Sequence, residues 1–210
     1  MKFSKAMEAL EQGRKITRPS FGKNDFLVAE AHAEYPGVWF YRDGVRERVV
    51  EIEGLFFVDD FMVVPERAVI VDIDGTIADC THRLHYIQNQ PKDWDSFYEA
   101  CSDDKPIPDV LELCRHLHER YLLLFVTGRK AKVRFKTRDW LEEYFNLDRC
   151  ELFMRGEMDR REDWIVKKEI YEQCIAPFYS VQFVLEDRQQ CVDMWRKLGL
   201  TCLQCDKGDF

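Results

Sequence analysis

The pattern of hydrophobic and polar positions changes near Pro65 and divides the chain into two parts. Beyond it, Ala68-Val69-Ile70-Val71 is a continuous, mostly β-branched run, which is typical of a buried parallel strand. Similar apolar runs recur at 122–126, 151–154, 181–185 and 200–204. Between the runs, apolar residues return at helical spacing over 110–120, 132–145, 164–174 and 191–198. This alternation predicts an α/β domain at 67–210, with a Rossmann-like parallel sheet that carries helices on both faces.

The first 66 residues follow a different pattern. Residues 3–11 predict a short helix that carries Phe3, Met7 and Leu10 on one side. Short apolar stretches then follow at 26–28, 38–41 and 61–64, with a turn at 42–44. Such stretches, separated by turn residues, predict a small, mainly antiparallel α+β domain at 1–66.

The overall charge restricts the classes of partner that we expect. The chain has 210 residues, a formal net charge of −8 and a sequence pI of about 5.3. A dedicated binder of long duplex nucleic acid usually has a basic footprint, so the acidity argues against that class. A local basic patch would still allow the protein to grip the end of a single strand.

The cysteines and the apolar windows indicate a cytoplasmic protein without a membrane partner. Several of the eight cysteines lie inside apolar runs, and no apolar leader precedes them, so we expect reduced thiols in the core. The motif Cys202-Leu203-Gln204-Cys205 stands alone and gives weak support for a zinc or redox site. No window approaches the roughly 18 apolar residues that a membrane helix needs.

Two aspartates, Asp72 and Asp74, follow the first buried strand and precede Gly75. Alternate residues of a strand face the same side, so both carboxylates can emerge together at the end of the sheet. Two close carboxylates ionise together only when a cation lies between them, and Mg²⁺ prefers such oxygen ligands. One carboxylate can then attack phosphorus while the other transfers protons. The glycine allows a tight turn whose following amides can receive phosphate oxygens, although an ordinary Asp-Gly turn accounts for the same residues.

Three further segments place chemistry at the ends of later elements. Thr127-Gly128-Arg129 ends the second strand with a hydroxyl, an open backbone and a cation, which suit a phosphoryl pocket. A lysine pair, Lys167 and Lys168, lies on a helix, where one side chain can point inward. Glu186-Asp187 ends a third strand and can complete a metal site. Each segment also has an ordinary structural explanation, but four of them in order along one sheet favour a shared site.

The order Asp-Ile-Asp-Gly-Thr, Val-Thr-Gly-Arg, inward lysine and Glu-Asp resembles the four motifs of the haloacid dehalogenase superfamily. Within it, residues 69–210 resemble the 3′-phosphatase domain of phage polynucleotide kinase–phosphatases, which implies a small cap or none. The matching stretches are 72–83, 126–129, 163–171, 185–196, 199–204 and 208–210.

The resemblance implies a role for each motif and Mg²⁺ as cofactor. Asp72 is then the nucleophile, while Asp74 protonates the leaving oxygen, later activates water and places its carbonyl on Mg²⁺. Thr127 and Lys167 hold the phosphoryl oxygens. The implied metal ligands are Asp72, Asp74, Glu186 and Asp187, and the residues that bind substrate or support the site are Gly75, Thr76, Arg83, Gly128, Arg129 and Asp163.

The sequence departs from this family in two places. Glu186 stands where an aspartate is usual, so the metal geometry there differs by one methylene. The phage enzymes also pair the phosphatase with a kinase that carries a phosphate-binding Gly-Lys-Ser/Thr loop. Here Gly22-Lys23 is followed by Asn24 and lacks the earlier glycine, so we expect no kinase activity from this chain.

The N-terminal 66 residues weakly resemble a small phage domain related to Thoeris anti-defence proteins. The likeness rests on residues between Phe3 and Pro19 and on the closing segment 59–64, in which Phe61 replaces the usual tryptophan. It implies nucleotide binding or self-association, and we favour a folding or homo-oligomerisation module.

The segment from His82 to Pro106 is too short for a large cap and predicts a shallow lid over an open cleft. Its aromatic residues Trp94, Phe97 and Tyr98 either stack on a base or anchor the lid to the core. The basic run from Arg129 to Arg138 is either a patch that follows a nucleic-acid backbone or a solvated helix surface.

Three hypotheses for function follow. The first is removal of 3′-phosphates from polynucleotide ends, and the second is hydrolysis of free nucleotides by the same chemistry. The third is a non-enzymatic protein that sequesters nucleotides against host defence, against which the intact acidic pair argues.

Overall fold

The computed structural model describes residues 3–18, 21, 26–30, 37–42, 45–48, 62–88 and 90–208. The chain divides into two compact units, Met1–Glu66 and Arg67–Phe210. Among the described residues, no helix has the length and apolar character that crossing a bilayer requires. All eight cysteines are free thiols.

The first unit combines one helix with an antiparallel sheet. Its elements are α1 (Phe3–Glu11), β1 (Ile16–Thr17), β2 (Phe26–Glu30), β3 (Gly37–Arg42), β4 (Val45–Arg48) and β5 (Met62–Val63), and the strands lie in the order β4-β3-β2-β1-β5. Among the side chains of α1 whose burial is described, Ala6, Ala9 and Leu10 are buried and Met7 is half-buried, so Leu10 faces inward as predicted, while Phe3 lies outside the described side chains. The predicted turn residues Asp43 and Gly44, and Phe61 of the closing segment, lie outside the described residues.

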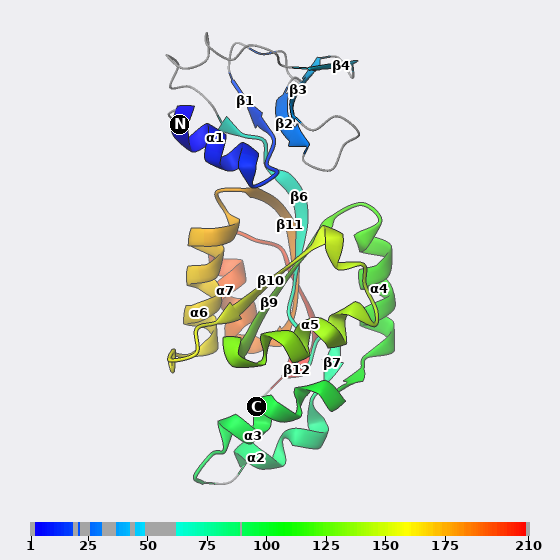
Figure 1. Cartoon of the computed structure of the whole chain (residues 1–210). Helices are drawn as coiled ribbons and strands as arrows, with labels where there is room; N and C mark the ends of the chain where they lie inside the picture. Colours follow the sequence, from blue (N-terminus) through cyan, green and yellow to red (C-terminus); the bar gives the residue numbers. More distant parts are fainter. Residues whose placement is uncertain are drawn as a thin grey trace. The chain divides into compact units, whose positions relative to one another are not determined.

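The second unit is built on a five-stranded sheet (Figure 1). Its strands are β6 (Glu66–Val71), β9 (Leu122–Lys130), β10 (Cys150–Arg155), β11 (Tyr179–Arg188) and β12 (Cys202–Gly208), and they lie in the order β10-β9-β6-β11-β12. The pairings of β9 with β6 and β10, and of β11 with β12, are parallel. The helices between them are α4 (Pro108–His118), α5 (Arg134–Glu142), α6 (Asp163–Ile170) and α7 (Gln189–Lys197).

Alternate side chains of β6 divide between two hydrophobic clusters. Val69 and Val71 pack with residues of α4 and α5, such as Leu111 and Leu141. Ala68 and Ile70 pack in a second cluster that includes Trp195 of α7, and Trp164 and Ile170 of α6 border this cluster. Because residues 68–71 of β6 are buried on both sides of the sheet, that part of the strand is continuously apolar. The predicted α/β sheet with helices on both faces is confirmed.

The strands extend beyond the apolar runs that predicted them. β9 continues to Lys130, which pairs with Arg155, and β11 continues to Arg188, which pairs with Gly208. The backbone ladder thus includes the polar residues at the strand ends, which fixes where their side chains lie. Helices α5 and α6 are shorter than predicted, since a 3₁₀ turn at Ala131–Val133 precedes α5 and a π-helical turn at Tyr171–Ile175 follows α6.

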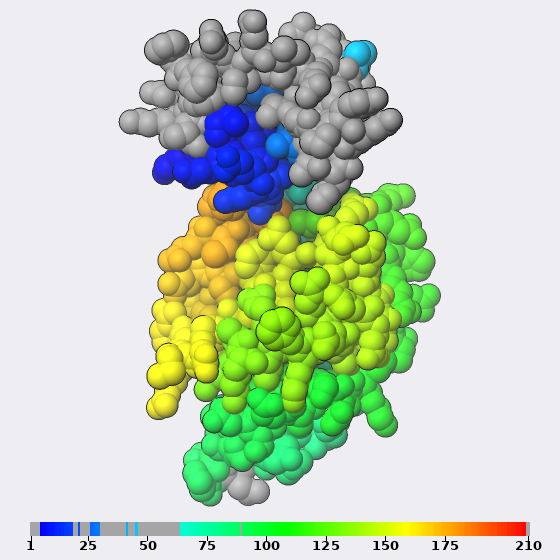
Figure 2. Space-filling view, in the orientation of Figure 1, coloured from blue at the N-terminus to red at the C-terminus, as the bar shows by residue number. Residues whose placement is uncertain are grey.

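The segment between β6 and α4 forms the small lid. It contains β7 (Ala78–Asp79), a 3₁₀ turn (Thr81–Arg83), α2 (His85–Gln88), α3 (Trp94–Glu99), a 3₁₀ turn (Ala100–Asp103) and β8 (Lys105–Pro106). Phe97 and Tyr98 are buried in a cluster with Val133 and Met154, and Figure 2 shows the lid packed against the surface of residues around 125–155. These two aromatic residues therefore anchor the lid, whereas Trp94 stays 37% exposed.

The basic run after β9 holds the lid in place. Lys132 donates to Asp95 at 2.7 Å, and Lys136 donates to the side chain and the backbone carbonyl of Glu99 at 2.9 Å. Both partners lie on α3, so neither lysine is free to follow a nucleic-acid backbone. Two lysines of the run therefore join the domain to its lid, an arrangement that neither sequence hypothesis included, whereas Arg138 lies on the exposed helix surface and pairs with Glu142.

The buried strands predict a clear difference between two leucines of this sheet. Leu124→Ala in β9, where the side chain is fully buried, is expected to lower the free energy of unfolding by about 2–5 kcal/mol. Leu203→Ala in β12, where 47% of the residue is exposed, should cost about 1 kcal/mol or less. Urea unfolding followed by tryptophan fluorescence measures both, since four of the five tryptophans belong to this unit. Equal losses would contradict the assigned core.

Candidate active site

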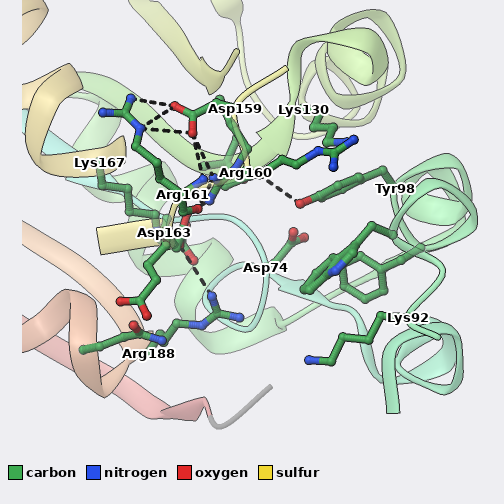
Figure 3. A pocket seen from close by; sticks show the side chains of 18 of the residues that line it. Asp74, Lys92, Tyr98, Lys130, Asp159, Arg160, Arg161, Asp163, Lys167 and Arg188 are labelled. Carbon is green, nitrogen blue, oxygen red and sulfur yellow. Dashed lines mark hydrogen bonds and ion pairs between the residues drawn. The ribbon is translucent and has the colours of Figure 1, made fainter. Parts of the chain in front are cut away.

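The carboxyl ends of β9, β6 and β11 lie side by side, because these strands are neighbours in the sheet. They bring Thr127, Asp72 and the pair Glu186-Asp187 to one edge, where parallel sheets usually hold their chemistry. All four residues line a cavity of about 650 Å³. Figure 3 shows Lys167, Asp163 and Arg188 on one side of it, Tyr98 and Lys92 on the other, and Asp74 between them.

Lys167 is the central cation of this edge. Its Nζ lies 2.7 Å from Asp72 Oδ1, 2.9 Å from Glu186 Oε2 and 3.2 Å from Asp163 Oδ2. Helix α6 sets this geometry, because Asp163 and Lys167 are one turn apart on the same face. The neighbouring Lys168 points outward and lies 3.7 Å from Glu172. The structure thus places Lys167, the better match to the family motif, at the site.

Burial and mutual repulsion raise the pKa values of the acidic residues around Lys167. Burial and the nearby Glu186 carboxylate raise the pKa of Asp72 to about 7, although Lys167 opposes the shift. Burial likewise raises the pKa of Glu186. The pKa of Lys167 is raised well above its ordinary value, because its carboxylate neighbours outweigh the burial that would lower it. Lys167 is therefore charged, and it is shared among more acids than it can neutralise.

Asp187 is held tightly but has an unused oxygen. Thr76 Oγ1 lies 3.3 Å from its Oδ1, while its Oδ2 is buried and has no hydrogen-bond partner among the described residues. A Cβ at Gly75 would lie 2.3 Å from Oδ2, and one at Gly208 would lie 1.7 Å from it, so only glycine fits at both positions. Burial and the Asp72 carboxylate raise the pKa of Asp187 to about 7.

The donor set fits a hard divalent cation. Asp72, Glu186 and Asp187 each offer one carboxylate oxygen, and these oxygens lie within 4.8 Å of one another. The unpartnered Oδ2 of Asp187 and the raised pKa values are expected where buried carboxylates have too few cations to pair with. Oxygen-only ligands favour Mg²⁺ or Ca²⁺ over softer metals. Glu186 also accepts hydrogen bonds from Lys167 and Trp195, so it has less freedom to bind a metal than Asp187.

Asp74 belongs to a second, separate charge cluster. Its Oδ1 accepts hydrogen bonds of 2.6 Å from Arg83 and of 2.6 and 2.9 Å from Arg129. Both arginines also bind Asp104, at 2.6–2.7 Å. Although burial opposes it, Arg129 and Arg83 hold the pKa of Asp74 well below its usual range. The other oxygen, Oδ2, accepts no hydrogen bond from a described residue, and Asp74 lines the cavity.

Two pairs of residues that we expected to bind substrate or support the site are not placed to contact a substrate in the cavity. Arg83 and Arg129 are both 0% exposed and do not line the cavity. They therefore orient Asp74 from the protein interior. The amide of Gly75 donates to the Ala78 carbonyl, and that of Thr76 donates to the Ile73 carbonyl. Neither amide is available to a phosphate oxygen, because the turn after β6 uses both for its own closure.

Thr127, Gly128 and Asp163 do line the cavity. A Cβ on Gly128 would lie 2.3 Å from Asp163 Oδ1, so this glycine allows α6 to approach the end of β9. Arg155 fixes the same corner, since it donates to the Gly128 carbonyl at 3.0 Å and to Asp163 at 3.2 Å.

Sequence reasoning missed Asp104 and Arg155. Asp104 is 4% exposed and joins Arg83 to Arg129, yet it lies in the polar stretch Ser102-Asp103-Asp104-Lys105, which indicates only a loop. Arg155 ends β10, the edge strand, and a single arginine after an apolar run is common. The signal that could have found both is their position in the chain: Asp104 lies near the end of the lid, and Arg155 is the last residue of β10.

Comparison with known proteins identifies the family and the fold. Residues 66–210 match the family model of the polynucleotide kinase PNKP phosphatase domain. The chain is 32% identical over 136 residues to a protein of Autographa californica nuclear polyhedrosis virus named "Putative bifunctional polynucleotide kinase/RNA ligase". That match covers 64% of this chain and 18% of the viral protein.

Solved structures with the same fold include two of a Pnkp1/Rnl/Hen1 complex, one of which is titled an RNA repair complex. Their similar chains are 29% and 30% identical, with TM-scores of 0.57 and 0.58, over 80% of this chain and 51% and 56% of theirs. A class C acid phosphatase from Bacillus anthracis shares the fold at 14% identity and a TM-score of 0.50, over 70% of this chain and 69% of its own.

The chain thus spans about half the length of the repair-complex proteins and under a fifth of the viral relative. The family model, however, covers most of this chain and the whole of the sheet that carries the acids. The chain therefore belongs to the family of polynucleotide kinase PNKP phosphatase domains, within the haloacid dehalogenase superfamily.

Proposed function

We propose that this chain is a Mg²⁺-dependent phosphomonoesterase that acts through a phospho-aspartate on Asp72 and removes 3′-phosphates from polynucleotide ends. The observation that carries the proposal is the contact of Asp72 with buried Lys167, beside an Asp187 oxygen that has no partner among the described residues. The family to which residues 66–210 belong supports a phosphatase on polynucleotide ends.

The two acidic residues of the first motif divide the work between them. Asp72 attacks phosphorus, so that a new bond forms to its carboxylate oxygen while the bond to the leaving 3′-oxygen breaks. Asp74 supplies the proton to the leaving oxygen through Oδ2, the oxygen that Arg83 and Arg129 leave open. A bound phosphate dianion adds negative charge beside Asp74 and raises its pKa toward the value that proton transfer needs.

Hydrolysis of the phospho-aspartate then regenerates the enzyme. Asp74, now deprotonated, accepts a proton from the water that attacks phosphorus, and the Asp72 carboxylate is the leaving group. Lys167 and Thr127 hold phosphoryl oxygens during both steps. Mg²⁺, held by Asp72, Asp187 and Glu186, would neutralise the negative charge that gathers on the phosphoryl group.

Lys167 and Lys168 form a matched pair for testing the site. Lys167→Met leaves Asp72 and Glu186 without their buried cation, so we expect phosphatase activity to fall at least about a hundredfold. Lys168→Met removes only an exposed ammonium that lies 3.7 Å from Glu172, and activity should stay within about twofold. Phosphate release by both variants, with circular dichroism as a check on folding, decides this. Equal activities would place the catalytic lysine elsewhere.

A substrate panel tests the nucleophile and the substrate class together. Wild type and Asp72→Asn are offered, with Mg²⁺, a 3′-phosphorylated oligonucleotide, a 5′-phosphorylated oligonucleotide and a nucleoside 3′-monophosphate. We expect wild type to release phosphate fastest from the first, and Asp72→Asn to lose at least about a hundredfold, because the amide cannot attack phosphorus. Faster release from the mononucleotide would favour a phosphatase of free nucleotides. Equal release by the two proteins would refute the phospho-aspartate mechanism.

Mg²⁺ binding should depend on pH in a defined direction. The pKa values of Asp72 and Asp187 are raised from 3.8 to about 7, so protons compete with the metal below that pH. Without metal, the folded protein holds these protons more tightly than the unfolded chain, so this contribution to stability falls as pH rises from about 4 to about 7.

We therefore expect Mg²⁺ to raise the melting temperature more at about pH 8 than at about pH 5.5. Asp187→Asn should remove most of this increase, whereas Asp193→Asn, an exposed residue of α7, should keep it. Differential scanning calorimetry with and without Mg²⁺ measures it. A stabilisation that is the same at both pH values, or one that persists in Asp187→Asn, would show that the metal binds elsewhere.

A further inference from the structure

Trp94 is a large aromatic residue that the lid leaves partly uncovered. It is 37% exposed and lines the cavity, whereas Phe97 and Tyr98, on the same helix, are 2% and 8% exposed. An aromatic ring at the rim of a cavity has an apolar surface that water covers poorly, and nucleobases stack readily on such a surface.

The ring is also held in one orientation. Trp94 stacks on Tyr98 with centroids 5.9 Å apart and an interplanar angle of 26°, and its contact with Phe97 is edge-on at 5.8 Å. Asp93 caps the helix by accepting a hydrogen bond from the Ser96 amide. Because α3 is further fixed by its ion pairs with Lys132 and Lys136, a base that stacks here immobilises little that is not already ordered.

Two cations at the rim remain available for a ligand. Lys92 is exposed, and its Nζ lies 5.3 Å from the Trp94 ring centroid, a weak contact that an incoming base can replace. Arg160 is exposed, lines the cavity and has no ion pair or hydrogen bond with any described residue. In contrast, the next residue, Arg161, is held by Asp159 and Glu169 at 2.6 Å each.

We propose that Trp94 is a stacking platform for a base of a single-stranded polynucleotide near its phosphorylated end, and that Lys92 and Arg160 bind the adjoining phosphodiester. The proposal rests on the function proposed above and names the determinant of substrate length for the same site. The carboxylates of Asp72, Glu186 and Asp187, with their metal, bind the terminal phosphate. Lys92 and Arg160 bind a phosphodiester group that a mononucleotide lacks.

The stacking step is tested by removing the ring and the base in turn. The substrates are a 3′-phosphorylated oligonucleotide and its counterpart in which the last nucleotides are abasic. Trp94→Ala should raise KM for the first about tenfold and for the second less than twofold, with kcat nearly unchanged for both. Trp94→Phe should restore most of the affinity. Phe135→Ala, another exposed aromatic position but outside the cavity lining, is the control and should change neither value.

Binding without chemistry separates this proposal from the proposed function. Fluorescence anisotropy with a 3′-hydroxyl oligonucleotide, which cannot be dephosphorylated, should show the same loss in Trp94→Ala. Arg160→Gln should weaken binding and lower the dependence of log affinity on log salt by about one, whereas Arg120→Gln, exposed and outside the cavity lining, should not.

Each result bears on one proposal. Equal effects of Trp94→Ala on the normal and the abasic strands, or no effect on either, would overturn the platform even if phosphate release is normal. Ring-dependent binding by a protein that releases phosphate from no substrate would leave the platform standing and refute the phosphatase.

Discussion

The burial of three carboxylates, Asp72, Glu186 and Asp187, near the Lys167 ammonium, which contacts only the first two, is the constraint on which the site depends. Buried carboxylates are costly unless a cation or a proton neutralises them. Lys167 neutralises part of this negative charge. The part that remains raises the pKa values of Asp72 and Asp187, and one oxygen of Asp187 has no partner among the described residues. A cluster that is short of positive charge is suited to take up a metal ion and then a phosphoryl group.

The second charge cluster is balanced, and this difference in charge explains the difference in role. Two arginines, Arg83 and Arg129, face two aspartates, Asp74 and Asp104, with contacts of 2.6–2.9 Å. A buried network in which positive and negative charges pair one to one has little tendency to move or to bind further ions. It therefore holds Asp74 in a fixed position at the edge of the unbalanced cluster and leaves one oxygen of Asp74 open to the cavity.

The lid connects this chemistry to the choice of substrate. It contributes Asp104 to the balanced cluster and Trp94 to the rim of the cavity, so one short segment both fixes Asp74 and borders the entrance. Its own attachment comes from buried Phe97 and Tyr98 and from lysines after β9.

The sequence by itself determined the α/β architecture, the three strand ends that meet and the presence of an inward-pointing lysine on the later helix, whereas the contact of that lysine with Asp72 came from the structure. Apolar runs and helical spacing are local properties, and parallel strands bring their ends together whatever the loops do. Only the tertiary structure decided that Arg83 and Arg129 lie beneath Asp74, that Asp104 joins them, and that Trp94 is exposed while Tyr98 is buried. These outcomes depend on which side chains the lid packs against, and no local pattern in the sequence records that.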